Sequence, residues 1–397
     1  MRYRNLNDVG GKTAFGIMAA TIRQCPAGKG SLMKTVLPEP QLCRDMAEQA
    51  RKLNLNMDVY VFALDDYDSS TQTLLGYRPE HSGWRRSSVP LPDIIYDRCF
   101  FTRPADRQRY RTALAELGEA KRYQLLNGRL PSKLQVYNAL RSCSALKRCL
   151  PRTIVYRSAQ QLLEISDYYT DGVIAKPAAG MQGRGVLHIY REKQNHSIHI
   201  QGRSLRNHSF LLELQSASQL ERWLRRATAN RSYLIQPCLK LTGNDGRPFD
   251  VRALWQKDGN GRWRSSGTAV RCGQAGSITS NLHGGGDAES AQSALSSKFG
   301  KLESERLLEQ IHTICWQSAI RLEEQFGRFA ELAFDFGIEP DGKVWLLEVN
   351  SKPGRTAFRL AEDKAAQIHS IERPLLYAQY LTRIIRIRPF NVQEVHR

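Results

Sequence analysis

The stretch Glu331-Leu-Ala-Phe-Asp335-Phe-Gly-Ile-Glu-Pro-Asp-Gly-Lys-Val-Trp345-Leu-Leu-Glu348-Val-Asn350-Ser-Lys-Pro-Gly354 decides the fold predicted for this chain. Its first part alternates apolar and other side chains at a period of two, as a half-buried strand requires. Residues 340–343, Pro-Asp-Gly-Lys, form a turn in which glycine tolerates a positive φ. The apolar run at 344–349 then predicts a second strand, so the stretch is expected to fold as a β-hairpin.

Three oxygen-bearing side chains interrupt this apolar hairpin: Asp335 in the first strand, and Glu348 and Asn350 on either side of Val349. Glu348 and Asn350 are two residues apart and therefore point to one face of a strand. Pairing around the turn would bring Asp335 to the same face. Two carboxylates and an amide oxygen suit Mg²⁺, which keeps water and phosphate oxygens in its other positions. A row of solvated edge carboxylates is the alternative, but the apolar neighbours argue against it because unpaired buried carboxylates are costly.

The order of these residues resembles the metal-binding end of the ATP-grasp superfamily. With Trp345 before the Glu and Lys352-Pro-Gly-Arg355 after the Asn, it closely resembles the YheC/YheD-type family, named for association with the bacterial spore coat. The resemblance implies an α/β (α+β) ATP-grasp fold, in which two α+β lobes clasp ATP behind a small N-terminal α/β domain. It implies four parts: an N-terminal domain at 1–130, a first lobe at 131–240, a second lobe at 241–372, and a C-terminal helix with a basic tail at 373–397.

A second informative stretch is an apolar strand that ends in Lys176 and leads through a glycine-rich loop into another strand at 186–190. Glycine lets backbone N–H groups approach a phosphate closely. Alone, such a hairpin is more often only a turn. Together with Lys176 and the downstream carboxylates, it predicts a flexible flap that closes over the phosphates of ATP. The flap residues are Gly180, Gln182, Gly183, Arg184 and Gly185.

The remaining nucleotide contacts are implied by the resemblance. Lys133 begins a helix predicted at 133–146 and matches a lysine that reaches the nucleotide phosphates; without the resemblance it would be an ordinary surface lysine. The strand that breaks at Pro237 matches the hinge that contacts adenine, with Gln236 and Cys238 on either side. Many members have Glu where this chain has Gln236, so a backbone contact remains possible and the side-chain role stays open.

Arg252, Arg271 and Asn281 are the predicted catalytic residues. Arg252 shares a strand face with Asp250, and an ion pair between them is the simpler interpretation; the resemblance places Arg252 near phosphates or the carboxylate substrate. The fork of arginine matches an oxyanion at two points. Asn281 and the glycines after it match a segment close to the transferred phosphate, and His283 in that segment is a weak candidate for a general base.

Charge favours an anionic partner. The chain has 58 Lys and Arg against 39 Asp and Glu, a formal net charge of +19. Between Arg98 and Arg157 there are 14 basic and 3 acidic residues. Such a field attracts anions. Nucleotide, nucleic acid, an acidic polymer and an acidic peptide all fit it, as does a basic surface that only aids solubility, and the charge alone does not choose between them. For an acceptor, the charge suggests an acidic peptide or an anionic polymer. Nucleic acid is less favoured, because this basic stretch lacks interleaved aromatic residues that stack on bases.

Cysteine usage and hydropathy predict where in the cell the protein is found. The 8 cysteines form no CxxC pair, which fits reduced thiols in a cytosol. The start of the sequence has no signal-peptide pattern, and no apolar run of about 18 residues predicts a membrane span. A cytoplasmic protein is expected, and the resemblance adds association with the forespore or coat.

Periodicity predicts the elements outside the motifs. Helices are expected at 40–53, 107–117, 217–227 and 302–324, and strands at 58–64 and 93–97. After Arg355, two helices are expected at 357–371 and 375–385. Their separation follows from Pro374, because proline has no N–H and clashes with the preceding helical turn.

Members of the superfamily usually join a carboxylate to an amine or thiol through an acyl phosphate, releasing ADP and phosphate. The resemblance therefore implies an ATP- and Mg²⁺-dependent ligase. Two other functions remain open at this point. One is a non-catalytic, spore-associated protein that uses a nucleotide-binding core as a scaffold. The other is a basic nucleic-acid-binding protein.

Overall fold

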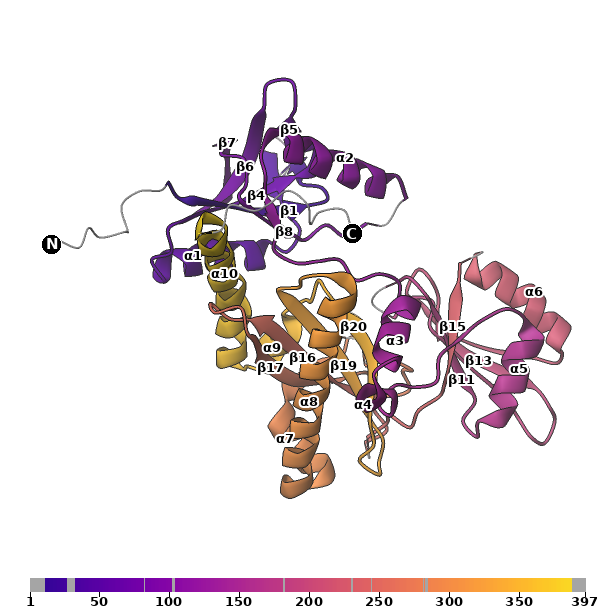
Figure 1. Cartoon of the computed structure of the whole chain (residues 1–397). Helices are drawn as coiled ribbons and strands as arrows, with labels where there is room; N and C mark the ends of the chain where they lie inside the picture. The colour runs from indigo at the N-terminus through magenta and orange to yellow at the C-terminus, as the bar shows by residue number, and fades with distance from the viewer. Residues whose placement is uncertain are drawn as a thin grey trace.

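Three large β-sheets, each with its own helices, organise the computed structural model of the chain (Figure 1). The structure describes residues 11–26, 33–81, 83–101, 104–180, 183–229, 231–243, 245–280, 282 and 285–387. The N-terminal sheet lies at the top of the figure, and the sheets of the two lobes follow below it and to the right. Within the described residues, no helix combines the length and the apolar character needed to cross a bilayer.

The N-terminal sheet has the strand order β5-β6-β4-β1-β8-β9, with β7 paired to β6. All seven residues of β1 are buried, as expected for a central parallel strand covered on both faces. Helices α1 and α2 provide that cover from opposite sides. The elements are β1 (Thr13–Ala19), α1 (Pro40–Lys52), β4 (Met57–Ala63), β5 (Tyr67–Asp68), β6 (Thr73–Glu80), β7 (Gly83–Val89), β8 (Ile94–Asp97), α2 (Pro104–Ala120) and β9 (Gln124–Leu125), with a separate hairpin of β2 (Arg23–Pro26) and β3 (Met33–Val36).

The first-lobe sheet is antiparallel, with the strand order β10-β15-β11-β12-β13-β14. Helices α5 and α6 share one hydrophobic core with it. Lys176 and Gln236 lie on the adjacent strands β11 and β15. The elements are β10 (Ile154–Val155), α5 (Ala159–Tyr168), β11 (Val173–Pro177), β12 (Leu187–Arg191), β13 (Ile198–Arg203), β14 (Ser209–Leu214), α6 (Ala217–Thr228) and β15 (Tyr233–Pro237).

The second-lobe sheet has the strand order β18-β17-β16-β19-β20. Helix α8 packs on one face, against Val251, Ala253 and Trp255 of β16, while α9 and α10 pack on the other face, against Leu254. The elements are β16 (Phe249–Lys257), β17 (Trp263–Cys272), β18 (Asp287–Ser290), α7 (Ala291–Phe299), α8 (Lys301–Phe326), β19 (Glu331–Ile338), β20 (Val344–Asn350), α9 (Thr356–Leu360) and α10 (Lys364–Ile387).

The helix predicted at 133–146 is divided into α3 (Lys133–Arg141) and α4 (Ser144–Lys147). At the break, the Ser142 hydroxyl donates to the Ala139 carbonyl at 2.7 Å, a local bond that competes with helix continuation. Both helices contribute to the core under α8, and Arg321 of α8 donates to the same Ala139 carbonyl at 3.2 Å. This segment therefore packs on the second lobe and leads into the first; the domain boundaries stay a prediction.

The prediction of two helices separated at Pro374 is wrong, because α10 continues through this residue. Proline supplies no N–H to the carbonyl four residues before it, here that of Ser370. That carbonyl instead accepts from Gln256 Nε2 at 3.1 Å and from Arg355 Nη2 at 3.4 Å. Side-chain donors from other elements thus replace the missing helical hydrogen bond. A rule based on local sequence does not predict such distant partners.

Candidate active site

The hairpin of β19 and β20 forms as predicted and places Asp335 directly opposite Glu348, with Ala333 opposite Asn350. The pairing contains a β-bulge at Leu347, since Phe336 pairs with Leu346. Without this extra residue, Glu348 would share a face with Leu346, which belongs to the core under α8. The bulge redirects the following side chains. Glu348 and Asn350 therefore join Asp335 on the face opposite α8.

Asp335 is held by two arginines from the neighbouring strands. Arg252 on β16 forms a double hydrogen bond with its carboxylate, one of them from Nη2 to Oδ2 at 2.7 Å. Arg271 on β17 approaches Oδ2 to 3.1 Å. Burial alone would raise the pKa of this carboxyl, but the two guanidinium groups lower it to about 2. Asp335 is thus an ionised, oriented carboxylate.

The ion pair expected between Asp250 and Arg252 is replaced by pairs that cross between strands. Arg252 binds Asp335, and Asp250 accepts two hydrogen bonds from Arg271, both at 2.6 Å, and one from the Ser280 hydroxyl. The expectation was wrong because residues on adjacent strands face each other more directly than residues two apart on one strand. Both predicted arginines are consequently locked next to Asp335.

Two lysines from the other side of the site approach Glu348 and the bulge. Lys133, at the start of α3, places Nζ 3.4 Å from Glu348 Oε1. Lys176, on β11, donates from Nζ to the Leu347 carbonyl at 3.4 Å. With Gln236, these residues line one cavity, so positions far apart in the sequence meet where the two lobes face each other. The complete lining is Pro131, Lys133, Val136, Tyr137, Leu140, Leu150, Pro151, Thr153, Lys176, Leu234, Gln236, Leu346, Leu347, Glu348 and Val349.

The hinge strand β15 ends at Pro237, as predicted. The Gln236 side chain donates to Thr153 Oγ1 at 2.7 Å, so it fixes the chain after α4. The Cys238 N–H donates to the Gly172 carbonyl at 3.0 Å, and burial raises the pKa of its thiol to about 12. The cavity beside this hinge is about 60 Å³, room for a few waters. Admitting a purine there requires the lobes or lining side chains to move apart.

Nucleotide affinity is expected to decrease above pH 8 because of Lys176. Burial, with the neighbouring Lys133 cation, lowers the pKa of Lys176 to about 8, although Glu348 and Asp335 oppose this. The charged form, which is predicted to attract phosphate, is therefore lost as the pH rises through this value. The dissociation constant for ATP, measured by calorimetry, should rise by up to about tenfold per pH unit above pH 8.

Lys176→Arg provides the comparison for this titration, because arginine keeps its charge at these pH values. ATP binding by this variant should change little between pH 7 and pH 9. Calorimetry of wild type at pH 8.5 in buffers of different ionisation enthalpy should also detect proton uptake. Equal pH profiles for both proteins, with no proton uptake, would contradict a phosphate contact by Lys176.

The glycine-rich flap connects β11 to β12. Gly183 and Gly185 have φ values of +68° and +74°, a region that favours glycine. A Cβ on Gly185 would lie 2.8 Å from Tyr233 Oη, while one on Gly180 would meet Pro177 at 3.5 Å. Arg184 lies between the two positive-φ glycines and is exposed. Gln182, together with Asn281 and His283 of the other predicted glycine segment, lies outside the described residues.

Gly185→Ala is expected to lower the free energy of unfolding by about 1–3 kcal/mol, because it combines a positive φ with a close contact. Gly180→Ala is the matched control within the same loop and should differ from wild type by less than about 0.5 kcal/mol. Urea denaturation of both variants measures the difference. Similar destabilisation by the two substitutions would mean that the flap backbone is not restricted at Gly185.

Glu331 is an important residue to which the sequence analysis gave no role. It is fully buried at the start of β19, four residues before Asp335. Its carboxylate accepts from Tyr96 Oη at 2.6 Å, Gln256 Nε2 at 2.9 Å and Arg355 Nη2 at 2.5 Å. In the sequence, Glu331 is visible only as an acidic residue at the start of an apolar strand. Its partners lie far away in the sequence, so their contacts could not be predicted.

The same network holds the loop that follows Asn350 against the N-terminal sheet. Arg98, at the carboxyl end of β8, donates to the Pro353 carbonyl at 3.1 Å and pairs with Glu39. Lys352 Nζ donates to Asp97 Oδ2 at 2.7 Å and to the Cys99 carbonyl at 2.8 Å. The N-terminal sheet therefore positions the chain immediately after the predicted metal-binding residues.

Comparison with solved structures identifies the fold. D-alanyl-alanine synthetase A from Vibrio cholerae O1 biovar eltor str. N16961 is similar with a TM-score of 0.53 and 13% identity, covering 96% of this chain and 100% of that one. D-cycloserine synthetase DcsG is similar with a TM-score of 0.51 and 12% identity, covering 91% and 99%. At these identities the likeness establishes the fold alone. The predicted ATP-grasp fold is confirmed.

Sequence comparison identifies the family. The endospore coat-associated protein YheC of Bacillus subtilis (strain 168) is 29% identical over 308 residues, which cover 77% of this chain and 82% of the relative. The endospore coat-associated protein YheD of the same organism is 25% identical over 324 residues, covering 81% and 70%. A family model described as YheC/D-like ATP-grasp matches residues 122–381. The chain therefore belongs to the YheC/D-like ATP-grasp family.

Proposed function

We propose that this protein is an ATP-dependent, ADP-forming ligase that joins a carboxylate to an amine or a thiol. The γ-phosphoryl group of ATP would pass to a carboxylate oxygen, giving an acyl phosphate and ADP. The amine or thiol would then attack the carbonyl carbon, and inorganic phosphate would leave. The observation that carries the proposal is the meeting of Lys133, Lys176, Asp335 and Glu348 at the junction of the two lobes.

Magnesium fits the residues on the hairpin face opposite α8. Asp335, Glu348 and Asn350 offer only oxygen ligands, and Asp335 is ionised at any neutral pH. These three residues would hold the ion, which supplies charge neutralisation at the transferred phosphate. Asp335 is also fixed by Arg252 and Arg271, which contact both of its oxygens, so binding the ion would require these guanidinium groups to give up part of the carboxylate.

Position and charge compensation would provide most of the catalysis. Lys133 and Lys176 would attract the α- and β-phosphates, and Gln236, Pro237 and Cys238 would face the adenine, largely through the backbone. Arg252 and Arg271, with Asn281, would orient the acceptor carboxylate or the γ-phosphate. The flap at 180–185 would exclude water from the acyl phosphate.

The acceptor is proposed to be acidic, such as an acidic peptide or an anionic polymer. The net charge of +19 and the basic segment from Arg98 to Arg157 support this. The names of the Bacillus relatives support a role in sporulation, in the forespore or at the coat. A cytoplasmic site of action is consistent with eight free cysteines.

Hydroxylamine trapping tests the reaction class without knowledge of the amine. The protein is incubated with ATP, Mg²⁺ and candidate carboxylates, including acidic peptides, and hydroxylamine converts any acyl phosphate to a hydroxamate. A carboxylate-dependent hydroxamate with stoichiometric ADP is the expected result. ATP binding without hydroxamate or ADP from any carboxylate would favour the alternative of a spore-associated nucleotide-binding scaffold.

A further inference from the structure

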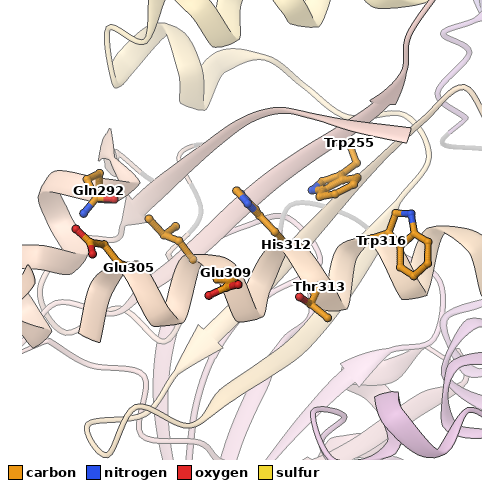
Figure 2. A pocket seen from close by; sticks show the side chains of 8 residues that line it. Trp255, Gln292, Glu305, Glu309, His312, Thr313 and Trp316 are labelled. Atoms are coloured by element: carbon orange, nitrogen blue, oxygen red, sulfur yellow. The ribbon is translucent and has the colours of Figure 1, made fainter. Parts of the chain in front are cut away.

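A groove runs along α8, on the face of the second-lobe sheet opposite Asp335 and Glu348 (Figure 2). Its volume is about 570 Å³, within the range of ligand sites. None of the described residues assigned above to nucleotide or metal contributes to it. This α8 groove is lined by Trp255 of β16, Gln292 of α7, and Glu305, Leu308, Glu309, His312, Thr313 and Trp316 of α8.

Two tryptophans from different elements form the apolar part of the α8 groove. Trp316 is 52% exposed on the surface of α8, whereas Trp255 is only 8% exposed. Figure 2 shows both rings at the same end of the groove, with His312 beside Trp255. The buried Nε1–H of Trp255 has no hydrogen-bond partner within the described part of the chain. A buried donor without an acceptor is unfavourable, and a ligand that brings an acceptor would relieve it.

The charged part of the α8 groove is acidic. Glu305 and Glu309 lie one helical turn apart, are exposed, and form no ion pair with any described residue. The lining contains no lysine or arginine. Burial lowers the pKa of His312, so its ring is neutral at neutral pH. The groove therefore has a negative character in a chain whose net charge is +19.

We propose that the α8 groove binds a short peptide segment of a partner protein in which basic side chains stand next to an apolar one. The basic side chains pair with Glu305 and Glu309, and the apolar side chain covers Trp316, where cation–π contact is also available. A backbone carbonyl of the peptide accepts from Trp255 Nε1 once the His312 ring turns aside. This site is independent of the proposed ligase activity.

The combination of groups favours a peptide over a free amine. An ammonium ion satisfies the carboxylates but offers no acceptor to Trp255, and it fills a small part of the volume. A peptide supplies cation, apolar surface and carbonyl together, the pattern by which grooves beside helices recognise amphipathic segments. Because this chain is itself basic, a second copy of the chain is the alternative occupant of the groove. The experiment below distinguishes a second copy from a partner peptide.

Phage-displayed random peptides of about 12 residues, which span about 18 Å when helical, provide the test. The library is selected on wild-type protein and counter-selected on the Glu305→Lys, Glu309→Lys double variant. Enriched sequences should carry lysine or arginine beside leucine or an aromatic residue. The best synthetic peptide should bind the double variant and Trp316→Ala at least roughly tenfold more weakly, and should shift the indole N–H signal of Trp255 in a spectrum of the labelled protein.

The matched control is a double variant on α2, Glu116→Lys with Glu119→Lys, which makes the same change in charge as the α8 double variant. It should bind the peptide like wild type. No enrichment, enrichment of acidic peptides, or equal weakening by the two double variants would overturn the proposal. A wild-type dimer in light scattering that dissociates in Trp316→Ala would also overturn it, by assigning the groove to a second copy. The ATP affinity of every variant should remain unchanged, which separates this test from the ligase proposal.

Discussion

Replacing Glu348 with glutamine is expected to weaken Mg²⁺-dependent ATP binding by roughly 100-fold, because loss of a metal ligand should cost at least as much as loss of an outer-shell partner, about 10–100-fold. Glutamine keeps the size of the side chain and removes its charge. In the structure the Glu348 carboxylate forms an ion pair with Lys133 at 3.4 Å, so a bound cation would share the carboxylate with this lysine. Calorimetric titration of ATP with and without Mg²⁺ gives the affinity of each protein.

Exposed Glu213 on β14 supplies the control, because Glu213→Gln makes the same chemical change away from the cavity. It should bind Mg-ATP like wild type. Unchanged Mg²⁺ dependence in Glu348→Gln would remove Glu348 from the metal site. Absence of ATP binding in all three proteins would contradict the ligase proposal.

The sequence predicted the hairpin and its face of oxygen ligands because both depend on local pattern. The period of two placed Glu348 with Asn350, and the turn at 340–343 brought Asp335 opposite Glu348. The bulge at Leu347 was not predicted. Strict alternation would have placed Glu348 beside Leu346 in the core, so the correct face required an irregularity that only the packed sheet reveals.

The sequence analysis did not predict the contacts between segments that are distant in the chain. The pairing of Asp335 with Arg252 and Arg271 depends on strand order in the sheet, which no local pattern specifies. The passage of α10 through Pro374 depends on Gln256 and Arg355, which bind the freed carbonyl. In both cases a buried polar group is satisfied by a partner from another element, and the family resemblance predicted the lobes without these partners.

Replacing Glu331 with alanine is expected to lower the free energy of unfolding by about 3–5 kcal/mol, the usual effect of removing one partner from a buried charged network. The carboxylate is fully buried and receives hydrogen bonds from Tyr96, Gln256 and Arg355, with Arg98 Nη1 3.6 Å away. Its loss leaves two buried guanidinium groups without this counter-charge. Urea denaturation followed by tryptophan fluorescence measures the change.

Glu303→Ala is the comparison for an ion pair of similar length in solvent, since Glu303 pairs with Arg306 at 2.5 Å on the exposed side of α8. It should lower stability far less than Glu331→Ala, because solvent screens an exposed ion pair. Because Glu331 also connects β8 to the loop after Asn350, hydrogen exchange in Glu331→Ala should increase at 94–98 and at 351–355 together. A loss of stability as small as that of Glu303→Ala, with unchanged exchange in both segments, would mean that burial alone and not the Glu331 network fixes the N-terminal sheet beside the strand of the proposed metal site.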